Sequence, residues 1–169
     1  MSVDNGSAIK ESKTTFEKVS TVVSLLLIIA NAIYLFVQWQ TLPDQVPIHF
    51  NAKGEADGWG NKRMVWFLPA ITLMLWGGMT ILEKMPHVYN IPNLTEENKD
   101  QQFMNTRLML NIVKTEIIIF LVYTSWQSVQ WSHGKEAGLG YFELPIFLIV
   151  MLGTIGVFLY RNNKIGKNK

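Results

Sequence analysis

The sequence predicts an all-α membrane protein, a bundle of four transmembrane helices with an ordered extracytoplasmic loop between helices 1 and 2. Of its 169 residues, 49% are hydrophobic and only 17% are charged, whereas an ordinary soluble domain is about one-quarter charged. The apolar residues gather in four runs, each close to the roughly 20 residues with which a helix crosses about 30 Å of hydrocarbon. Four spans leave no room for a separate soluble domain, so we expect one membrane domain.

These four runs set the expected order of segments. The first run has no ionisable residue and continues beyond the small-x-small sequence at residues 30–32. We therefore expect a retained span rather than a cleaved signal peptide. The expected segments are a cytoplasmic tail at 1–18, a two-helix unit at 19–82 with spans at 19–39 and 64–82 and a loop at 41–63, a cytoplasmic connection at 83–107, two further helices within 108–160 with spans at 108–126 and 141–160, and a cytoplasmic tail at 161–169.

The distribution of Lys and Arg predicts the orientation of the spans. Cytoplasmic segments of membrane proteins carry the excess of these residues. The segments on the side of the N-terminus hold ten of them: Lys10, Lys13, Lys18, Lys84, Lys99, Arg107, Arg161, Lys164, Lys167 and Lys169. The opposite side holds four: Lys53, Lys62, Arg63 and Lys135. We therefore expect a multi-pass protein of the cell membrane with both termini in the cytoplasm.

Several functional classes find no support in the composition. The formal net charge is only +2, too small to suggest nucleic acid as a partner. The chain contains no Cys, which excludes disulfides and thiol-ligated metals. The sequence shows no phosphate-binding loop, zinc motif or nucleophile–base signature. We therefore expect no cofactor, no metal and no assignable catalytic residues, and the lipid bilayer is the one partner that composition alone indicates.

The segment between the first two spans has the most distinctive sequence. Pro43 and Pro47 fix φ at their own positions and favour extended backbone before them, so we expect a stiff, extended stretch over 42–50. Residues that favour turns follow it, namely Asn51, Gly54, Asp57, Gly58 and Gly60. The loop is therefore expected to be ordered over the membrane surface, held there by aromatic side chains at the lipid interface.

A spaced pattern within this loop points to a known family. Residues 42–59 read Leu-Pro-x-x-x-Pro-x-His-Phe-Asn-x-x-Gly-x-x-Asp-x-Trp. After a first membrane span, this pattern resembles the domain of unknown function 1648, the N-terminal membrane domain of SdpI-like bacterial immunity proteins, over about residues 19–82. The resemblance implies protection against a secreted toxin and, as in the founding type, recruitment of a transcriptional repressor. The family's C-terminal Gly-Ile-Arg-Thr-Pro-Trp-like motif does not follow Arg107, so the resemblance is confined to the N-terminal domain.

The pattern residues are the expected ligand-binding surface. They are Pro43, Pro47, His49, Phe50, Asn51, Gly54, Asp57 and Trp59. His49 could act as a base, a metal ligand or a pH sensor. However, the spacing of a metal site, such as two His at i and i+4, is missing. The alternative is a packed His49 that hydrogen-bonds turn backbone or Asn51.

Four polar residues are expected inside the membrane: Asn31, Asn111, Lys114 and Glu116. Glu116 would lie roughly 12 Å deep, where a charge costs several kcal/mol unless it is paired, protonated or hydrated. Its partner is therefore expected on another helix or in a wet cavity. Lys114 is expected to extend its ammonium back towards the cytoplasmic surface, and Asn111 and Lys114 share a face that could meet Asn31. These groups either join the helices or line a functional cavity.

Two further features predict local structure. Asn93 precedes Leu-Thr-Glu and is expected to cap a helix that leads into the third span. Gly77, Gly78, Gly153 and Gly156 are expected to allow close approach between helices.

Three functional hypotheses remain open from sequence. The first is a binding or protective protein that engages a toxin peptide or a lipid on the outer face, in immunity or envelope-stress signalling. The second is a small membrane enzyme or transporter that uses Glu116 or His49. The third is a regulatory subunit that binds a cytoplasmic regulator through residues 83–107.

Overall fold

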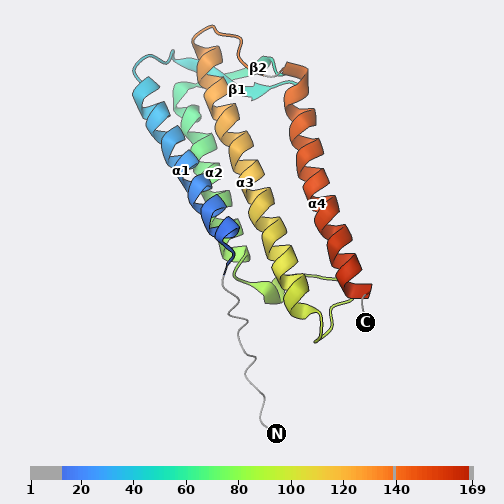
Figure 1. Ribbon diagram of the computed structural model, residues 1–169. Helices are drawn as coiled ribbons and strands as arrows, with labels where there is room; N and C mark the ends of the chain where they lie inside the picture. The colour runs from blue at the N-terminus through green and yellow to red at the C-terminus, as the bar shows by residue number, and fades with distance from the viewer. Residues whose placement is uncertain (1–12, 139, 168–169) are drawn as a thin grey trace.

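The computed structural model describes residues 13–138 and 140–167 (Figure 1). Most of the expected N-terminal tail, including Lys10, and the terminal Lys169 lie outside these residues. The described elements are α1 (Thr15–Gln38), β1 (Gln45–Phe50), β2 (Ala56–Asn61), the short 3-10 helix η1 (Lys62–Trp66), α2 (Phe67–Leu82), η2 (Pro86–Val88), α3 (Lys99–Ser132), η3 (Gly140–Phe142) and α4 (Glu143–Lys167).

The prediction of four spans is confirmed by the lengths and compositions of the helices. Within the described residues, four helical segments are long and apolar enough to cross a membrane: Thr15–Gln38, Lys62–Leu82, Lys99–Ser132 and Gly140–Lys167. The third begins nine positions before the expected residue 108 and has 34 residues, or about 50 Å of helix. The helix is longer than the apolar run because the polar residues 99–107 are helical as well.

The expected helix cap at Asn93 is wrong. Asn93 has a left-handed φ of 57°, and α3 begins only after Asn98. Instead, the Asn98 side chain closes a preceding turn, since it accepts from the Thr95 backbone N–H at 2.9 Å and donates to the Asn93 carbonyl at 3.0 Å. The residues after Asn93 therefore form turns, and α3 begins at Lys99 rather than directly after Asn93.

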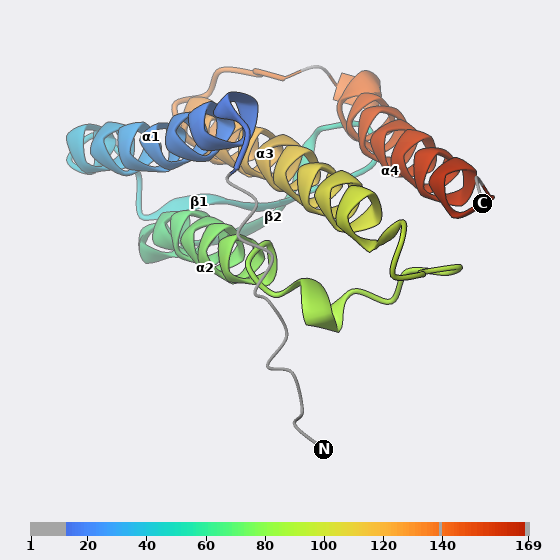
Figure 2. The same cartoon turned by 60° about the horizontal axis from the view of Figure 1, so that its bottom comes forward.

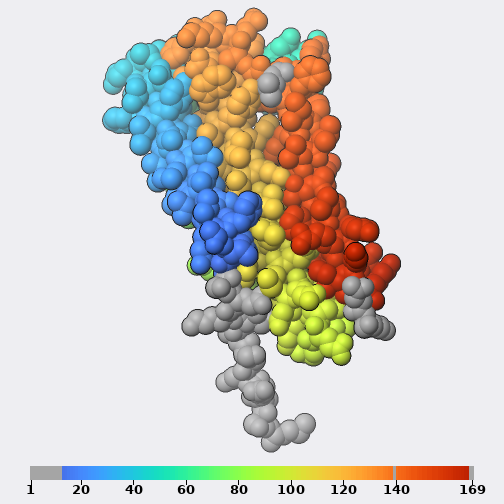
Figure 3. Space-filling view, viewed as in Figure 1, coloured from blue at the N-terminus to red at the C-terminus, as the bar shows by residue number. Residues whose placement is uncertain are grey.

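Helix α3 is the centre of the bundle, because α1, α2 and α4 all pack against it. Figure 2 shows α1 and α2 on one side of α3 and α4 on the other. On the face in Figure 3, α3 lies between α1 and α4, which flank it along the bundle. The start of α1 and the end of α4 lie at one end of the bundle (Figure 1), which we call the terminal end. The β-strands lie at the other, which we call the hairpin end.

The expectation that four glycines allow close approach between helices is wrong for the described residues. A Cβ added at Gly77, Gly78, Gly153 or Gly156 would meet nothing within 4 Å. For Gly153 and Gly156 of α4, the contacts with α3 use polar and aromatic side chains instead.

The burial pattern is that of a protein in lipid. Large apolar side chains cover the outside of the helices, as with Phe36, Met74 and Ile149, which are 71–75% exposed. Polar side chains fill the inside, and Gln102, Asn111, Lys114 and Gln127 are fully buried. A soluble fold would expose the second group and bury the first. The apolar surface is therefore matched to hydrocarbon, and polar contacts hold the helices together.

The ordered loop expected between the first two spans is an antiparallel hairpin of β1 and β2. It packs on the bundle through a small apolar core made by Leu35, Leu42, Val46, Val65 and Val129. Figure 2 shows the hairpin crossing the bundle from the side of α1 and α2 towards α4. The loop is thus ordered, as expected, and its extended first half forms strand β1.

Candidate functional site

The turn of the hairpin is built by Asn51 and Gly54. The Asn51 side-chain oxygen accepts from the backbone N–H groups of Lys53 at 2.8 Å and Glu55 at 3.1 Å, and its amide donates to the Glu55 carboxylate at 3.0 Å. Gly54 has a φ of 75°, and a Cβ there would lie 2.8 Å from the Gly140 Cα. Only a residue without a side chain fits this contact between the turn and the start of α4.

His49 and Asp57 form a pair across the hairpin. The strand register shifts on both sides of His49, and this irregularity brings His49 Nδ1 within 2.5 Å of Asp57 Oδ1. Gly58 is required opposite, because a Cβ at that position would lie 2.8 Å from the His49 Cβ. A hydrogen bond of this kind orients the imidazole ring and places a proton between Nδ1 and the carboxylate. His49 thus pairs with Asp57 and not with Asn51, which was the alternative partner expected from sequence.

Helix α3 holds the hairpin in place over the bundle. The Ser128 hydroxyl donates to the Pro47 carbonyl at 2.7 Å, which is a direct hydrogen bond between α3 and strand β1. The Phe50 ring meets Trp131 edge to face, with centroids 6.3 Å apart. These contacts make the hairpin a fixed cover rather than a loose loop.

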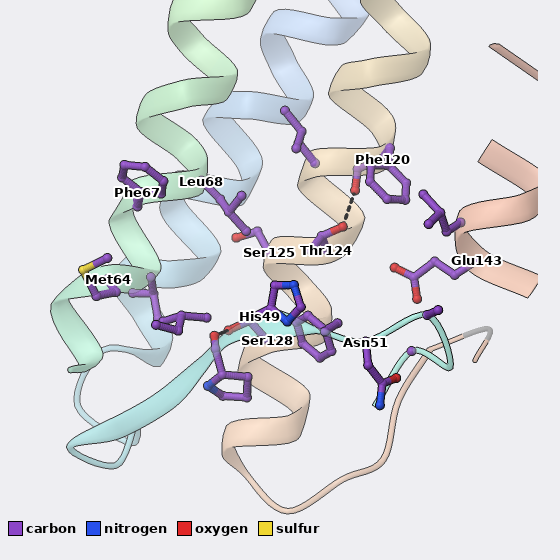
Figure 4. Close-up of a pocket in the computed structure, with 18 of the residues that line it drawn as sticks. His49, Asn51, Met64, Phe67, Leu68, Phe120, Thr124, Ser125, Ser128 and Glu143 are labelled. Atoms are coloured by element: carbon purple, nitrogen blue, oxygen red, sulfur yellow. Dashed lines mark hydrogen bonds between the residues drawn. The ribbon is translucent and has the colours of Figure 1, made fainter. Parts of the chain in front are cut away.

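Beneath this cover lies a pocket of about 380 Å³ between α2, α3 and α4 (Figure 4). Most of its wall is apolar and includes Phe67, Leu68, Phe120 and Leu121. Its polar side chains are His49, Asn51, Thr124, Ser125, Ser128 and Glu143. Figure 4 shows Thr124, Ser125 and Glu143 approaching the same space from two helices, above the His49 ring. The volume and the mixture of many apolar and few polar groups are typical of a small-molecule site.

Glu143, the first residue of α4, has an oxygen without a partner. Its Oε2 atom is buried and makes no hydrogen bond to any described residue. Gln127 approaches the carboxyl group from α3, and the Gln127 side-chain oxygen is likewise buried without a partner. Buried polar atoms normally have partners, so the Glu143 oxygen, which belongs to the pocket lining, can still accept a donor.

A comparison with protein families finds a match, which lies within the N-terminal half of the chain. Residues 26–73 match the family described as domain of unknown function (DUF1648). The chain contains a DUF1648 domain. No curated protein and no solved structure matches the chain. Together with the four apolar helices, the match identifies a multi-pass integral membrane protein.

The DUF1648 domain supplies the cover of the pocket and one of its walls. Residues 26–73 include most of α1, the whole hairpin and the first half of α2. The floor on α3 and the wall on α4, with Glu143, lie outside the domain. The pocket therefore combines the shared domain with a part of the chain that the family match does not cover.

The eight pattern residues have different positions around the pocket. Five of them line it: Pro47, His49, Phe50, Asn51 and Gly54. Asp57 does not line the pocket but contacts His49, which does. Pro43 and Trp59 are exposed and lie outside the lining, with Trp59 opposite Pro47 in the strand pairing.

Lys114 and Asn111 belong to a buried ionic cluster near the terminal end. Lys114 does not extend to the surface as expected, because its side chain is fully buried and its Nζ lies 2.6 Å from Glu83 Oε1. Asn111 donates to the same oxygen at 3.2 Å and to the Thr21 hydroxyl at 3.0 Å. Lys13 also pairs with Glu83. The cluster thus neutralises charges that hydrocarbon would not tolerate.

A second ion pair and a raised pKa complete the electrostatics of this end. Arg107 Nε lies 2.8 Å from Glu17 Oε1, which is buried at the start of α1. Outside the spans, burial and the nearby Glu83 carboxylate raise the pKa of Tyr89 to about 12. The Tyr89 hydroxyl donates to the Leu82 carbonyl at 3.1 Å and therefore stays protonated at neutral pH.

Asn31 and Glu116 lie apart from this cluster. The Asn31 amide donates to the Ser125 hydroxyl at 3.1 Å, so Asn31 does not meet Asn111 or Lys114. Glu116 Oε1 accepts from the Thr154 hydroxyl at 2.6 Å, which places its partner on another helix, as expected. Its second oxygen is buried without a described partner. Glu116 does not line the pocket beneath the hairpin.

Sequence reasoning missed Glu17, Glu83 and Glu143 as parts of buried sites. All three stand at or near the end of an apolar run, where a charged residue is ordinarily assigned to the headgroup region. A signal for Glu83 was present, because a Lys as deep as Lys114 requires a carboxylate partner. Within the described residues, no group of three His, Asp or Glu side chains is arranged to hold a metal.

Proposed function

We propose that this integral membrane protein binds an amphipathic ligand in the pocket beneath the hairpin and thereby protects the membrane from a membrane-active peptide or lipid-like toxin. The observation that carries the proposal is the fixed cover over a mostly apolar pocket with a few convergent polar groups. Such a site excludes water from an apolar chain while it offers polar contacts to one end of the ligand.

The proposal includes the orientation derived from Lys and Arg. The hairpin end would face the outside of the cell and the terminal end the cytoplasm. A ligand arriving from outside would then meet the pocket at the depth of the lipid headgroups. This arrangement accords with the immunity role that SdpI-like proteins imply, while the signalling role would need a cytoplasmic regulator at residues 83–107.

An enzyme is the second candidate, favoured by the His49–Asp57 pair at the pocket wall. A base alone does not make a nucleophilic site. Both lining serines are engaged elsewhere, since Ser128 donates to the Pro47 carbonyl and Ser125 accepts from Asn31. We therefore favour binding, with Asp57 holding the His49 ring in position as a ligand contact.

The test is complementation in a strain that lacks the gene. Cells would be challenged with a panel of membrane-active peptides and cell-envelope antibiotics, and the minimal inhibitory concentration measured. We expect the deletion to sensitise cells to at least one agent, the wild-type gene to restore resistance, and His49→Ala or Asp57→Ala to fail to restore it.

Matched controls come from the same residue types away from the pocket. His87→Ala and Asp44→Ala change exposed side chains outside its lining and should complement fully, with equal amounts of each protein in the membrane. Unchanged sensitivity of the deletion strain to the whole panel would contradict a protective role, and full activity of His49→Ala would remove the hairpin from it.

A further inference from the structure

We infer that the pocket selects an amphiphile with a positively charged head, such as an alkylammonium or a cationic lipopeptide, and that Glu143 is the residue that recognises the charge. The inference rests on the proposed binding function and adds the chemical class of the ligand. It is carried by Glu143, whose buried Oε2 has no described partner and whose carboxyl group points into the pocket in Figure 4.

The charges around the pocket all favour a cation. Among the described residues that line it, none is Lys or Arg. Glu143 provides a carboxylate, and the other titratable group, His49, already faces the carboxylate of Asp57. An anionic head would therefore meet the Glu143 carboxylate and no Lys or Arg side chain of the lining. A cationic head would give Glu143 a charge-assisted contact, which is stronger than a neutral hydrogen bond.

One further feature of the surroundings suits a cationic head. The faces of aromatic rings attract cations, and Phe120, which lines the pocket, stacks on Phe147 at 4.1 Å between centroids. A head group bound here would give the open Glu143 oxygen a partner.

The rim of the pocket suits an apolar tail. Met64 and Phe67 on the α2 side and Leu144 on the α4 side line the pocket and are 43–56% exposed. These side chains belong to the apolar outer surface of the bundle, which is matched to hydrocarbon. The tail of a ligand can therefore leave the pocket along these side chains and remain in hydrocarbon.

A neighbouring hollow extends the same preference. It shares Gly54 and Gly140 with the pocket and is lined by Lys53, Glu55 and Glu136. Lys53 lies over the Tyr141 ring, 5.9 Å from its centroid, and is not part of the pocket lining. Two carboxylates therefore stand beside the entry from the hairpin, against one ammonium.

The test measures binding of three probes that differ only in the head: dodecyltrimethylammonium, dodecanol and dodecyl sulfate. The full chain would be held in nanodiscs of zwitterionic lipid, and each radiolabelled probe titrated. Specific binding is the difference between wild type and Thr124→Trp, which fills the pocket from α3. We expect the ammonium to bind at least about tenfold more tightly than the other two.

The variant that decides the inference is Glu143→Gln, which keeps the shape of the side chain and removes its charge. We expect it to abolish the preference for the ammonium, whereas Glu97→Gln, which neutralises an exposed carboxylate before α3 that lines neither hollow, should keep it. Elution volume and thermal unfolding would confirm that each variant is folded.

Three results would overturn the inference, and they separate it from the proposed function. If Glu143→Gln keeps the ammonium preference, the charge is recognised elsewhere. If wild type binds all three probes equally above the Thr124→Trp background, the pocket binds amphiphiles but does not select cations. If no probe exceeds that background, the proposed binding function falls together with the inference.

Discussion

Three residues of the sequence pattern at 42–59 each make one specific contact in the hairpin or between its turn and Gly140. Asn51 supplies the acceptor that closes the turn, Gly54 passes beside Gly140, and Asp57 reaches His49 across a register shift. The sequence indicated that Asn51 and Gly54 favour turns. It could not indicate the His49–Asp57 pair, since that contact depends on an irregular strand pairing.

Replacing Gly54 by Ala should destabilise the hairpin. The left-handed φ disfavours any side chain, and the new Cβ would lie 2.8 Å from backbone of Gly140. We expect a loss of about 1–2 kcal/mol in the free energy of unfolding, measured by thermal unfolding in detergent. Gly153→Ala is the control, because its Cβ meets open space and Ala favours helix over Gly. Equal effects of the two substitutions would contradict the contact between the turn and α4.

Lys114→Met should be among the most destabilising single substitutions in the bundle. It removes a fully buried partner of Glu83, whose side chain is also fully buried. Because Lys13 still pairs with Glu83, we expect a loss of about 2–3 kcal/mol, at the low end for a broken buried pair.

The matched control for Lys114→Met is Lys99→Met. Lys99 pairs with the largely exposed Glu96, and pairs between exposed side chains contribute little to stability because water and salt screen them. Denaturant titration of both variants in the same detergent would compare them. Similar denaturant midpoints for the two variants would show that the cluster around Glu83 is solvated rather than buried.

The helices could be placed from sequence, but their ends and contacts could not. An apolar run marks the part of a helix that is suited to lipid. Helix α3 begins before its apolar run, because residues 99–107 are polar and also helical. The hairpin was not predicted as strands, since Ala56–Asn61 contains two glycines and does not alternate apolar and polar residues. Docking on α3 decides its structure.

Helix α4 is held to α3 by polar contacts that recur along both helices. On α3, Asn105, Glu116 and Gln127 follow at eleven-residue intervals, which is about three turns. They face Asn162, Thr154 and Glu143 of α4 in that order. In lipid, such contacts replace the apolar packing that would join helices in water.

This arrangement predicts that Asn162→Ala loosens α4. Asn162 accepts from the Asn105 amide at 2.8 Å and donates to the Thr106 hydroxyl at 2.9 Å. We expect faster hydrogen exchange in α4, with protection lowered by about 1 kcal/mol, and no change in α1. Asn163→Ala alters the exposed neighbour and should leave both helices unchanged. Equal exchange in the two variants would contradict the polar attachment.

As a whole, the molecule has an apolar exterior, a polar interior and two different ends. One end closes a pocket under a rigid hairpin, and the other neutralises buried charges between three helices. The sequence showed the membrane class of the protein through its apolar runs. It did not show the pocket, because the pocket is assembled from α2, α3, α4 and the hairpin, which are distant in the chain.

The proposed role requires that the hairpin end face the outside of the cell. Because the chain has no Cys, single cysteines can be introduced at the exposed Ala52 in the turn and the exposed Glu97 before α3. A membrane-impermeant thiol reagent would be added to intact cells and to permeabilised cells. We predict that Ala52→Cys reacts in intact cells and that Glu97→Cys reacts only after permeabilisation; the reverse pattern would contradict the account.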